Sequence, residues 1–316
     1  MIKYSEINNR NPRILLLGNG INKALGVDFD WARIKDRISK NNQDELIDLL
    51  LNHENNDMEQ CLRILDNTLE AKNFFGDKIN IDINDLTKAR KKLREQVCEE
   101  ISAEHSEKHI LEDAIQALSI RLKDFDAIFT LNYDLLLYWA VQLYNENLQV
   151  QERLNDGFGG SRDYGYYWGP FAQNQNIFYL HGGLHIFAAA DGAYKLFHTG
   201  ATDILTQFTS AISEKKFPLF VSEGFYSQKS NKISENNYLK YGLDILSGKR
   251  NKVKQECYSL FIFGTDLKEN DRHLTDAINK NHRIRDIYCF KISGLQSEIS
   301  NALNLSLIFF DADSFL

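Results

Sequence analysis

The sequence has 316 residues and contains few cysteines, and none of them are grouped. Cys61, Cys98, Cys257 and Cys289 stand alone, and no two are separated by only two residues. A structural zinc site usually needs close pairs of ligands, and disulfide frameworks belong to smaller, cysteine-rich secreted chains. We therefore expect reduced, buried thiols and no metal cofactor.

The sequence also lacks a basic excess and a long apolar run. Lys and Arg number 37 against 44 Asp and Glu, which gives a net charge of −7. Proteins that bind nucleic acid neutralise phosphates with a basic face, so no direct nucleic-acid binding is expected. No apolar run approaches the roughly 20 residues of a membrane span. The run from Ile14 to Leu17 has only the length of a strand, not that of a signal peptide. We expect a cytoplasmic protein without a membrane segment.

Proline and glycine are missing from a long part of the chain. No proline lies between Pro12 and Pro170, and Gly76 is the only glycine between Gly26 and Gly157. Helices tolerate such a stretch, and apolar residues recur there at three- and four-residue steps. The pattern predicts that residues 31–124 are mostly helical, with a loop near Phe75–Asn84.

Seven short apolar runs predict strands. They are Ile14–Leu17, Ala127–Leu131, Ile177–Leu180, Leu219–Val221, Leu260–Phe263, Ile287–Phe290 and Leu305–Phe309. Several are continuously apolar, which suits strands buried on both faces of a parallel sheet. Helical patterns lie between most of them, at Leu135–Tyr144, Thr202–Ile212, Tyr238–Leu246 and His273–Asn279. The alternation predicts an α/β protein with a doubly wound, mostly parallel sheet and a large helical insertion after the first strand.

Ligands of such sheets bind beyond the carboxyl ends of the strands. The first strand runs into Gly18-Asn19-Gly20-Ile21-Asn22. The two glycines would let the backbone approach a pyrophosphate, and the start of the next helix favours negative charge. Lys23 stands where the third glycine of a dinucleotide-binding turn would be. A tight turn without a ligand is the alternative.

The second strand ends in Thr130-Leu131-Asn132-Tyr133-Asp134. An amide and a carboxylate two residues apart can hydrogen-bond ribose hydroxyls and a carboxamide. The alternative is that Asn132 or Asp134 caps the helix that follows.

Two later strands also end in polar residues. His181-Gly182 follows one of them, and a histidine held there can act as a base. Gly264-Thr265-Asp266-Leu267 follows another, and suits a phosphate or ribose contact. A structural role is the alternative for His181 and the expectation for His185, while Asp266 can instead cap a turn. Asp271 and His273 do not stand out from surface residues.

These four motifs, in this chain order, resemble the sirtuin family. The corresponding segments are Gly18–Asn22, Thr130–Asp134, His181-Gly182 and Gly264–Leu267. The chain has no cysteine pairs for a sirtuin zinc, and 49 positions separate Asn132 from His181. It therefore looks more like the zinc-less, sirtuin-like NAD hydrolases of bacterial anti-phage defence. The runs Tyr179–His185 and Leu219–Gly224, with Lys229 and Tyr238-Leu239, resemble a subgroup of these known as a domain of unknown function.

The resemblance implies a Rossmann-like NAD-binding domain over residues 1–30 and 125–316, with 31–124 as a helical insertion. It implies NAD⁺ as the substrate, catalysis by Asn132, Asp134 and His181, and no metal. The implied NAD-binding residues are Gly18, Asn19, Gly20, Ile21, Asn22, Thr130, Tyr133, Gly264, Thr265 and Asp266.

The implied reaction is hydrolysis of NAD⁺ to nicotinamide and ADP-ribose, which would deplete NAD⁺ in abortive infection. A HerA-type ATPase partner is also implied by resemblance. A toxic hydrolase would need restraint, and we expect a homo-oligomer that could supply it. Two alternatives stay open: an NAD-dependent deacylase or ADP-ribosyltransferase, and a module that senses NAD⁺ or ADP-ribose without turnover. The sequence leaves open NAD⁺ against NADP⁺, and whether the aromatic segment Gly157–Gly169 is a lid over the ligand or a packed loop.

Overall fold

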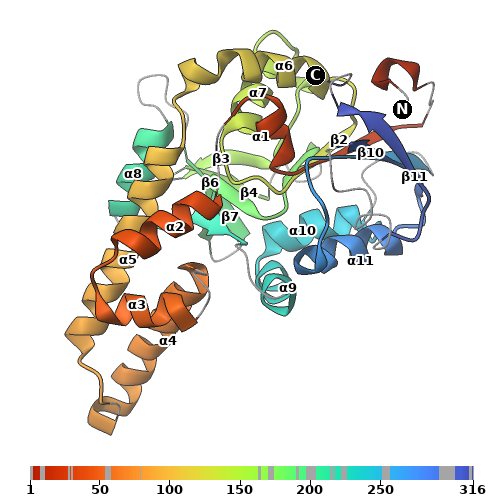
Figure 1. Ribbon diagram of the computed structural model, residues 1–316. Coiled ribbons are helices and arrows are strands. Elements are labelled where there is room, and N and C mark those ends of the chain that lie inside the picture. Colours follow the sequence, from red (N-terminus) through yellow and green to blue (C-terminus); the bar gives the residue numbers. More distant parts are fainter. Residues whose placement is uncertain are drawn as a thin grey trace.

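The fold is visible in a computed structural model (Figure 1). The structure describes residues 3–7, 11–27, 29, 31–53, 58–78, 80–162, 165–169, 174–189, 192–196, 204–213, 216, 218–221, 226–250, 257–291, 303–312 and 315. Ser222–Gly224, part of one run that carries the family resemblance, lie outside them.

The centre of the fold is a six-stranded sheet in which every pairing is parallel. Its strands are β1 (Arg13–Leu17), β2 (Ala127–Thr130), β5 (Ile177–Tyr179), β9 (Tyr258–Phe263), β10 (Ile284–Lys291) and β11 (Leu307–Asp311). They lie in the order β11-β10-β9-β1-β2-β5. Counted along the chain within this sheet, that order is 3-2-1-4-5-6, and it reverses direction between β1 and β9. The predicted parallel α/β sheet is confirmed, and its strand order is compatible with a Rossmann-like fold.

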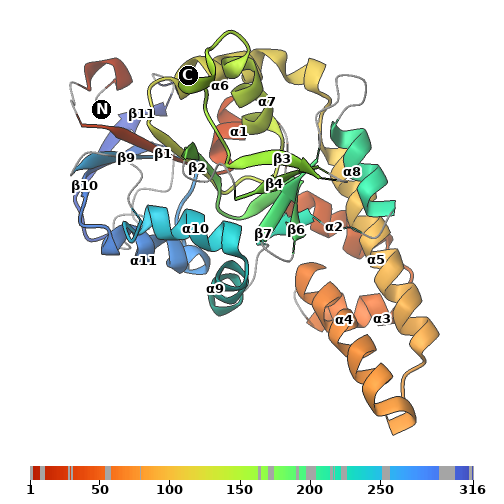
Figure 2. The ribbon, with the colours of Figure 1, turned by 180° about the vertical axis from the view of Figure 1, so that it is seen from behind.

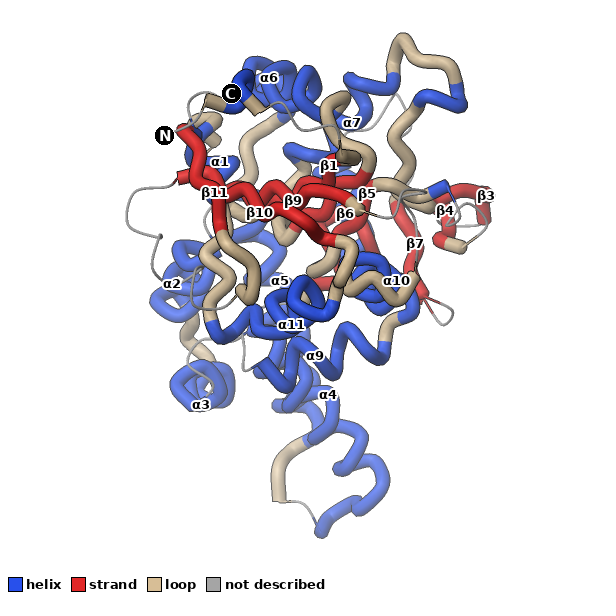
Figure 3. The backbone as a smooth tube through the Cα atoms, turned by 90° about the vertical axis from the view of Figure 1, so that its right-hand side faces the viewer, coloured by secondary structure: helices blue, strands red, loops and turns tan. Residues whose placement is uncertain are grey.

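Both faces of β1 are buried, which explains why Ile14–Leu17 is continuously apolar. Leu15 and Leu17 of β1 belong to one core cluster, and Ile14 and Leu16 belong to another. Successive side chains of a strand point to opposite faces, so the two clusters fill the two sides of the sheet. Helices α1, α6 and α7 lie on one side and α10 and α11 on the other (Figures 1 and 3).

The described elements between β1 and β2 are all helical. They are α1 (Gly20–Ala24), α2 (Trp31–Asn41), α3 (Glu45–His53), α4 (Met58–Phe75), η2 (Gly76–Lys78), α5 (Ile83–Glu104), η3 (Lys108–Leu111) and α6 (Glu112–Leu122). Arg37 on α2 bonds Glu100 and Glu104 on α5, which fixes the two helices together. Helices α2 to α5 project from the sheet (Figure 1). The division of the chain into two domains stays a prediction.

A second sheet of five strands was not anticipated from the sequence. It contains β3 (Phe158–Arg162), β4 (Gly165–Trp168), β6 (Gly182–Ala189), β7 (Gly192–Lys195) and β8 (Pro218–Phe220), paired antiparallel in the order β3-β4-β7-β6-β8. It lies beside the end of the parallel sheet, next to α8 (Figure 2). The expectation that Leu219–Val221 is a strand of the parallel sheet was wrong, because β8 pairs with β6. The described part of segment 157–169 is mainly strand rather than loop.

Of the remaining helices, α7, α8, α10 and α11 are close to the predicted ones, and α9 was not predicted. Helix α7 covers Leu136–Asn145, α8 Ile204–Ser213, α9 Tyr226–Glu235, α10 Asn237–Leu246 and α11 Arg272–Lys280. Two more short 3-10 turns, η1 (Tyr4–Glu6) and η4 (Val150–Glu152), lie outside these helices, and η6 (Glu269–Asp271) leads into α11. Among the described helices, none combines the length and the apolar character that crossing a membrane requires.

Candidate functional site

Two of the predicted turns meet where the strand order reverses. The Gly18 N–H donates to Phe263 O at 2.7 Å, and the Gly20 N–H donates to Gly264 O at 2.8 Å. A Cβ on Gly18 would lie 2.6 Å from Gly264 O, and a Cβ on Gly264 would lie 2.5 Å from the nitrogen of Ile21. Gly264 also has a φ of 78°, which disfavours any other residue. Glycine is therefore required at both positions for the turns after β1 and β9 to approach.

The same contacts reduce the number of backbone N–H donors that the Gly18–Asn22 turn has available for a ligand. The N–H groups of Gly18 and Gly20 already donate within the protein, as does that of Ile21, which donates to Gly18 O. Helix α1 spans only five residues, so its dipole is small. The turn provides a close approach of backbone rather than a set of free donors. Asn19 and Lys23, both exposed, are the polar side chains that it presents to solvent.

A chain of side-chain hydrogen bonds joins this turn to the Asn-x-Asp motif. Asn132 Nδ2 donates to Asn22 Oδ1 at 3.2 Å, and Asn22 Nδ2 donates to Asp134 Oδ2 at 2.7 Å. Asn22 is fully buried and Asp134 nearly so. The other oxygen of Asp134 accepts the N–H of Leu136, the first residue of α7. Asn132 Oδ1, in contrast, is buried and has no hydrogen-bond partner among the described residues.

Two other residues of the Thr130–Asp134 segment, Thr130 and Tyr133, have structural roles. Thr130 Oγ1 accepts the Asn132 N–H at 3.1 Å and so shapes the turn after β2. The Tyr133 hydroxyl donates to Val221 O, and Tyr133 O accepts the Leu184 N–H at 2.9 Å. Tyr133 therefore connects the end of the parallel sheet to the second sheet.

His181 lies at the same edge of the sheet as Asn132. Strands β2 and β5 pair in parallel with Thr130 opposite Tyr179, so Asn132 and His181 each follow this pair by two residues. The Leu180 N–H donates to Thr130 O at 2.9 Å, which holds the two chain segments side by side. The side chains of Asn132 and His181 thus lie just beyond the carboxyl ends of two adjacent strands.

His181 has a second histidine as its partner. Its Nε2 lies 3.0 Å from Nε2 of His273 on α11. On the same side, Lys229 of α9 donates to Asp271 Oδ1 at 2.8 Å, and one ligand atom each of His181, Asp271 and His273 lie within 4.8 Å of one another. Both imidazoles and Lys229 are buried.

The surroundings favour the neutral form of both imidazoles. Burial, followed by the charge of Lys229 and then His273, holds the pKa of His181 well below its ordinary value of 6.5. Burial and Lys229 lower the pKa of His273 to about 3. His181 is therefore a neutral hydrogen-bond acceptor or donor at pH 7 and a weak base.

His185 is a buried structural residue, as expected. It lies on β6, and its ring packs on those of Tyr138 and Tyr179 with centroids 4.7 Å away in each case. Neither ring nitrogen has a hydrogen-bond partner among the described residues. Burial, with a smaller effect of Lys195, holds its pKa well below 6.5.

The last predicted turn is partly open. Thr265 Oγ1 accepts the Leu267 N–H at 3.3 Å, and Asp266 forms an ion pair with Lys268 at 2.8 Å. Leu267 has a φ of 46°, which is unusual for a branched residue and stores strain beside the site. Thr265 and Asp266 are half-buried, so their side chains reach solvent at the carboxyl end of β9.

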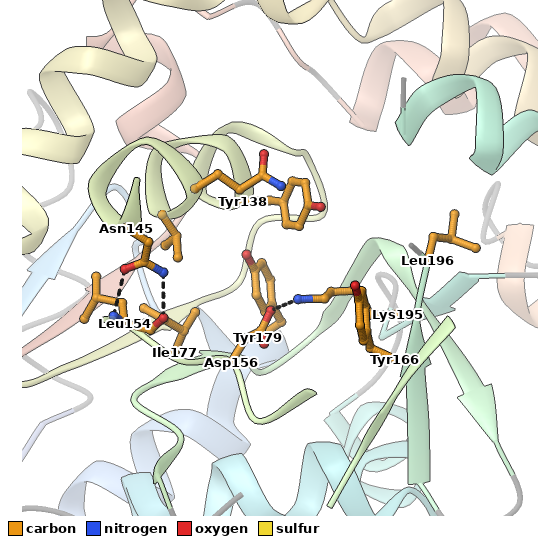
Figure 4. Close-up of a pocket in the computed structure, with 11 residues that line it drawn as sticks. Tyr138, Asn145, Leu154, Asp156, Tyr166, Ile177, Tyr179, Lys195 and Leu196 are labelled. Carbon is orange, nitrogen blue, oxygen red and sulfur yellow. Dashed lines mark hydrogen bonds and ion pairs between the residues drawn. The ribbon is translucent and has the colours of Figure 1, made fainter. Parts of the chain in front are cut away.

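A cavity of about 220 Å³ lies between α7, β5 and the second sheet (Figure 4). Tyr138, Tyr166 and Tyr179 form aromatic walls, and an ion pair between Lys195 and Asp156 lies among them (Figure 4). None of the predicted catalytic or NAD-binding residues lines it. The cavity and the polar cluster at the sheet edge are therefore separate features.

Sequence reasoning missed the partners of His181. His273 lies 92 positions further along the chain, and Asp271 and Lys229 come from two other elements. The only available signal was that Asp271 and His273 follow the turn after β9, whose carboxyl end adjoins the same edge of the sheet. Asn22 was assigned to the glycine turn, but its link to Asn132 and Asp134 has no local signature.

The structure thus defines an α/β protein with a polar cluster at the carboxyl edge of a parallel sheet. The chain belongs to the family described as a domain of unknown function (DUF4917), whose family model matches residues 15–312. No curated protein matches the chain.

Proposed function

We propose that this protein hydrolyses the bond between nicotinamide and ribose in NAD⁺, as its resemblance to sirtuin-like NAD hydrolases implies. The observation that carries the proposal is the position of Asn132. Its amide oxygen is buried without a partner, at the sheet edge that also holds His181 and the glycine turns. A buried, unsatisfied acceptor costs free energy, so its retention suits a ligand donor such as a ribose hydroxyl.

The strand order supports a dinucleotide at this edge. Doubly wound sheets bind ligands outside the carboxyl ends of the strands, at the point where the strand order reverses. Here that point lies between β1 and β9, where the Gly18 and Gly264 turns meet. The pyrophosphate would lie against the Gly18–Asn22 turn, with Lys23 available to balance its charge. Thr265 and Asp266 would contact the adenosine side.

The reaction breaks the C1′–N bond, and the bonding electron pair leaves with nicotinamide. Positive charge then develops on the ribose, and the oxygen of a water molecule bonds to C1′. The products are nicotinamide, ADP-ribose and a proton. Catalysis requires orientation of the ribose and water, and electrostatic support for the developing charge.

Asn132 would hold the ribose hydroxyls or the water through its free oxygen, and His181 would take the proton. A neutral imidazole can accept a proton at pH 7, and a weak base suffices where water attacks a strongly electrophilic cation. Both oxygens of Asp134 are already bonded, to Asn22 and to the Leu136 N–H. Asp134 would contact the nicotinamide carboxamide only after releasing one of them; otherwise it orients Asn132 through Asn22.

The test is release of nicotinamide from NAD⁺ by the purified chain, measured by chromatography. The chain is assayed alone, with the product of the neighbouring gene, and with an acetylated peptide. Asn132→Ala and His181→Ala should each lower the rate at least about 100-fold while the circular dichroism spectrum is retained. The matched controls Asn147→Ala and His282→Ala change exposed residues and should behave as wild type.

Each other outcome contradicts the proposal in a distinct way. Turnover that depends on the acetylated peptide identifies a deacylase, and transfer of ADP-ribose to protein identifies a transferase. Binding of NAD⁺ by calorimetry without nicotinamide release identifies a sensing module. Wild-type rates in both alanine variants would remove Asn132 and His181 from the mechanism. The proposal also includes the HerA-type partner and the role in anti-phage defence, which come from the same resemblance. It includes a homo-oligomer, which would restrain a toxic hydrolase, and the cytoplasmic location expected from the sequence.

A further inference from the structure

We propose that His181, His273 and Asp271 form a binding site for a divalent transition-metal ion. The three side chains come from the turn after β5, from α11 and from the 3-10 turn η6 that precedes it. Their ligand atoms lie within 4.8 Å of one another, and the two imidazole Nε2 atoms are 3.0 Å apart. Two nitrogens that bind one ion at about 2.1 Å lie roughly 3 to 3.4 Å apart, so the imidazoles need almost no movement.

The contact between the two rings also suits a metal. Metal ligation uses the lone pair of an unprotonated ring nitrogen, and the 3.0 Å contact between the two Nε2 atoms requires that at least one of them carries no proton. Coordination through Nε2 places the ring proton on Nδ1. Nδ1 of His273 has no hydrogen-bond partner among the described residues. No donor therefore requires Nδ1 to be unprotonated, and Nδ1 can carry the ring proton while Nε2 binds the ion.

Lys229 is the feature that opposes a cation here. Its ammonium group bonds one oxygen of Asp271 and is buried beside the two histidines. A carboxylate has a second oxygen, so Asp271 can keep Lys229 on Oδ1 and bind an ion through Oδ2. The positive charge of Lys229 nevertheless weakens binding, and removing it should strengthen binding. This dependence distinguishes a metal site from a plain hydrogen-bonded cluster.

The donor set indicates the class of ion. Two imidazoles and one carboxylate suit Zn²⁺, Co²⁺, Ni²⁺ or Fe²⁺, whereas Mg²⁺ and Ca²⁺ prefer oxygen ligands. Three protein ligands leave further positions of the ion open. The expectation that the chain has no metal rested on the cysteines, and these histidines are 92 positions apart in the sequence.

The site has a consequence that rests on the proposed function. We take Nε2 of His181 as the nitrogen that accepts the proton of the attacking water, and a metal bound there occupies its lone pair. NAD⁺ hydrolysis should therefore fall as the site fills and return when a chelator removes the ion. The metal would act as an inhibitor of the NAD⁺-hydrolysing form.

The experiment titrates the full-length, untagged and chelator-treated protein with Co²⁺ and then with Zn²⁺. Binding is followed by the visible absorption of protein-bound Co²⁺ and by calorimetry, neither of which depends on activity. Wild type should bind about one ion per chain. His273→Gln and the isosteric Asp271→Asn should each weaken binding at least about 10-fold, and Lys229→Met should strengthen it. His282→Ala, which removes an exposed histidine, is the matched control.

Unchanged Co²⁺ binding in both His273→Gln and Asp271→Asn, with folding verified by circular dichroism, would overturn the site. Absence of binding by wild type at millimolar Co²⁺ would also overturn it. The activity measurement separates the two proposals. If the protein binds metal but does not hydrolyse NAD⁺, the metal site is retained and the proposed function is contradicted. If the rate of NAD⁺ hydrolysis is the same with and without bound metal, only the inhibitory role is contradicted.

Discussion

Buried neutral histidines should make this protein unusually sensitive to acid. His181, His185 and His273 all have pKa values lowered by burial, to about 3 for His273. In the unfolded chain each imidazole returns to a pKa near 6.5. The unfolded state therefore binds protons first as the pH falls. The contribution of these histidines to the free energy of unfolding is present above pH 6.5 and is progressively lost as the pH falls below it.

The magnitude follows from this difference in proton binding. Between pH 7.5 and pH 5, one imidazole that stays neutral in the folded state lowers the free energy of unfolding by about 2 kcal/mol. The pKa values of His181 and His185 are also lowered by burial, so these residues add to the loss in the same direction. The free energy of unfolding should therefore be clearly lower at pH 5 than at pH 7.5.

His185 provides the sharpest variant because both of its ring nitrogens lack partners among the described residues. His185→Leu has a similar volume and should be neutral or stabilising at pH 7.5. It should remove a measurable part of the loss between pH 7.5 and pH 5. Urea unfolding, followed by tryptophan fluorescence at pH 7.5, 6 and 5, measures this, with the exposed His282→Ala as control. An identical acid dependence in His185→Leu and wild type would refute the reasoning.

Two further predictions concern stability. Gly264→Ala adds a Cβ 2.5 Å from the nitrogen of Ile21 at a φ of 78°, whereas Gly26→Ala adds one at a φ of 71° with nothing within 4 Å. Both should incur backbone strain of about 1 kcal/mol, but Gly264→Ala should lower the urea midpoint clearly more, and equal shifts would contradict the close approach of the turns. His105 Nε2 accepts the Leu135 N–H at 3.0 Å, and its Nδ1 lies 2.8 Å from Ser106 O. His105→Ala leaves that buried N–H without an acceptor and should cost at least about 1–3 kcal/mol in thermal unfolding, and an unchanged melting temperature would contradict this role.

The local pattern of apolar residues in the sequence was sufficient to predict much of the fold. Short apolar runs predicted all six strands of the parallel sheet, although β11 begins two residues later than expected. The pattern could not separate β8 from these strands, because a short apolar run reads the same in either kind of sheet. The second sheet was missed because Gly182-Gly183 reads as a turn. Yet Gly182 opens β6, with its φ of 78° and close approach to Leu219 O.

The sequence by itself determined which polar residues follow each strand, because carboxyl ends of parallel strands share one edge. Only the tertiary structure decided what those residues contact. Asn22 reaches Asp134 across 112 positions of the chain, and His181 reaches His273 across 92. Such contacts depend on where the crossover helices place distant segments, and no local spacing records that. The same holds for charge: Lys229 lowers the pKa of both histidines through space, which only the folded chain can show.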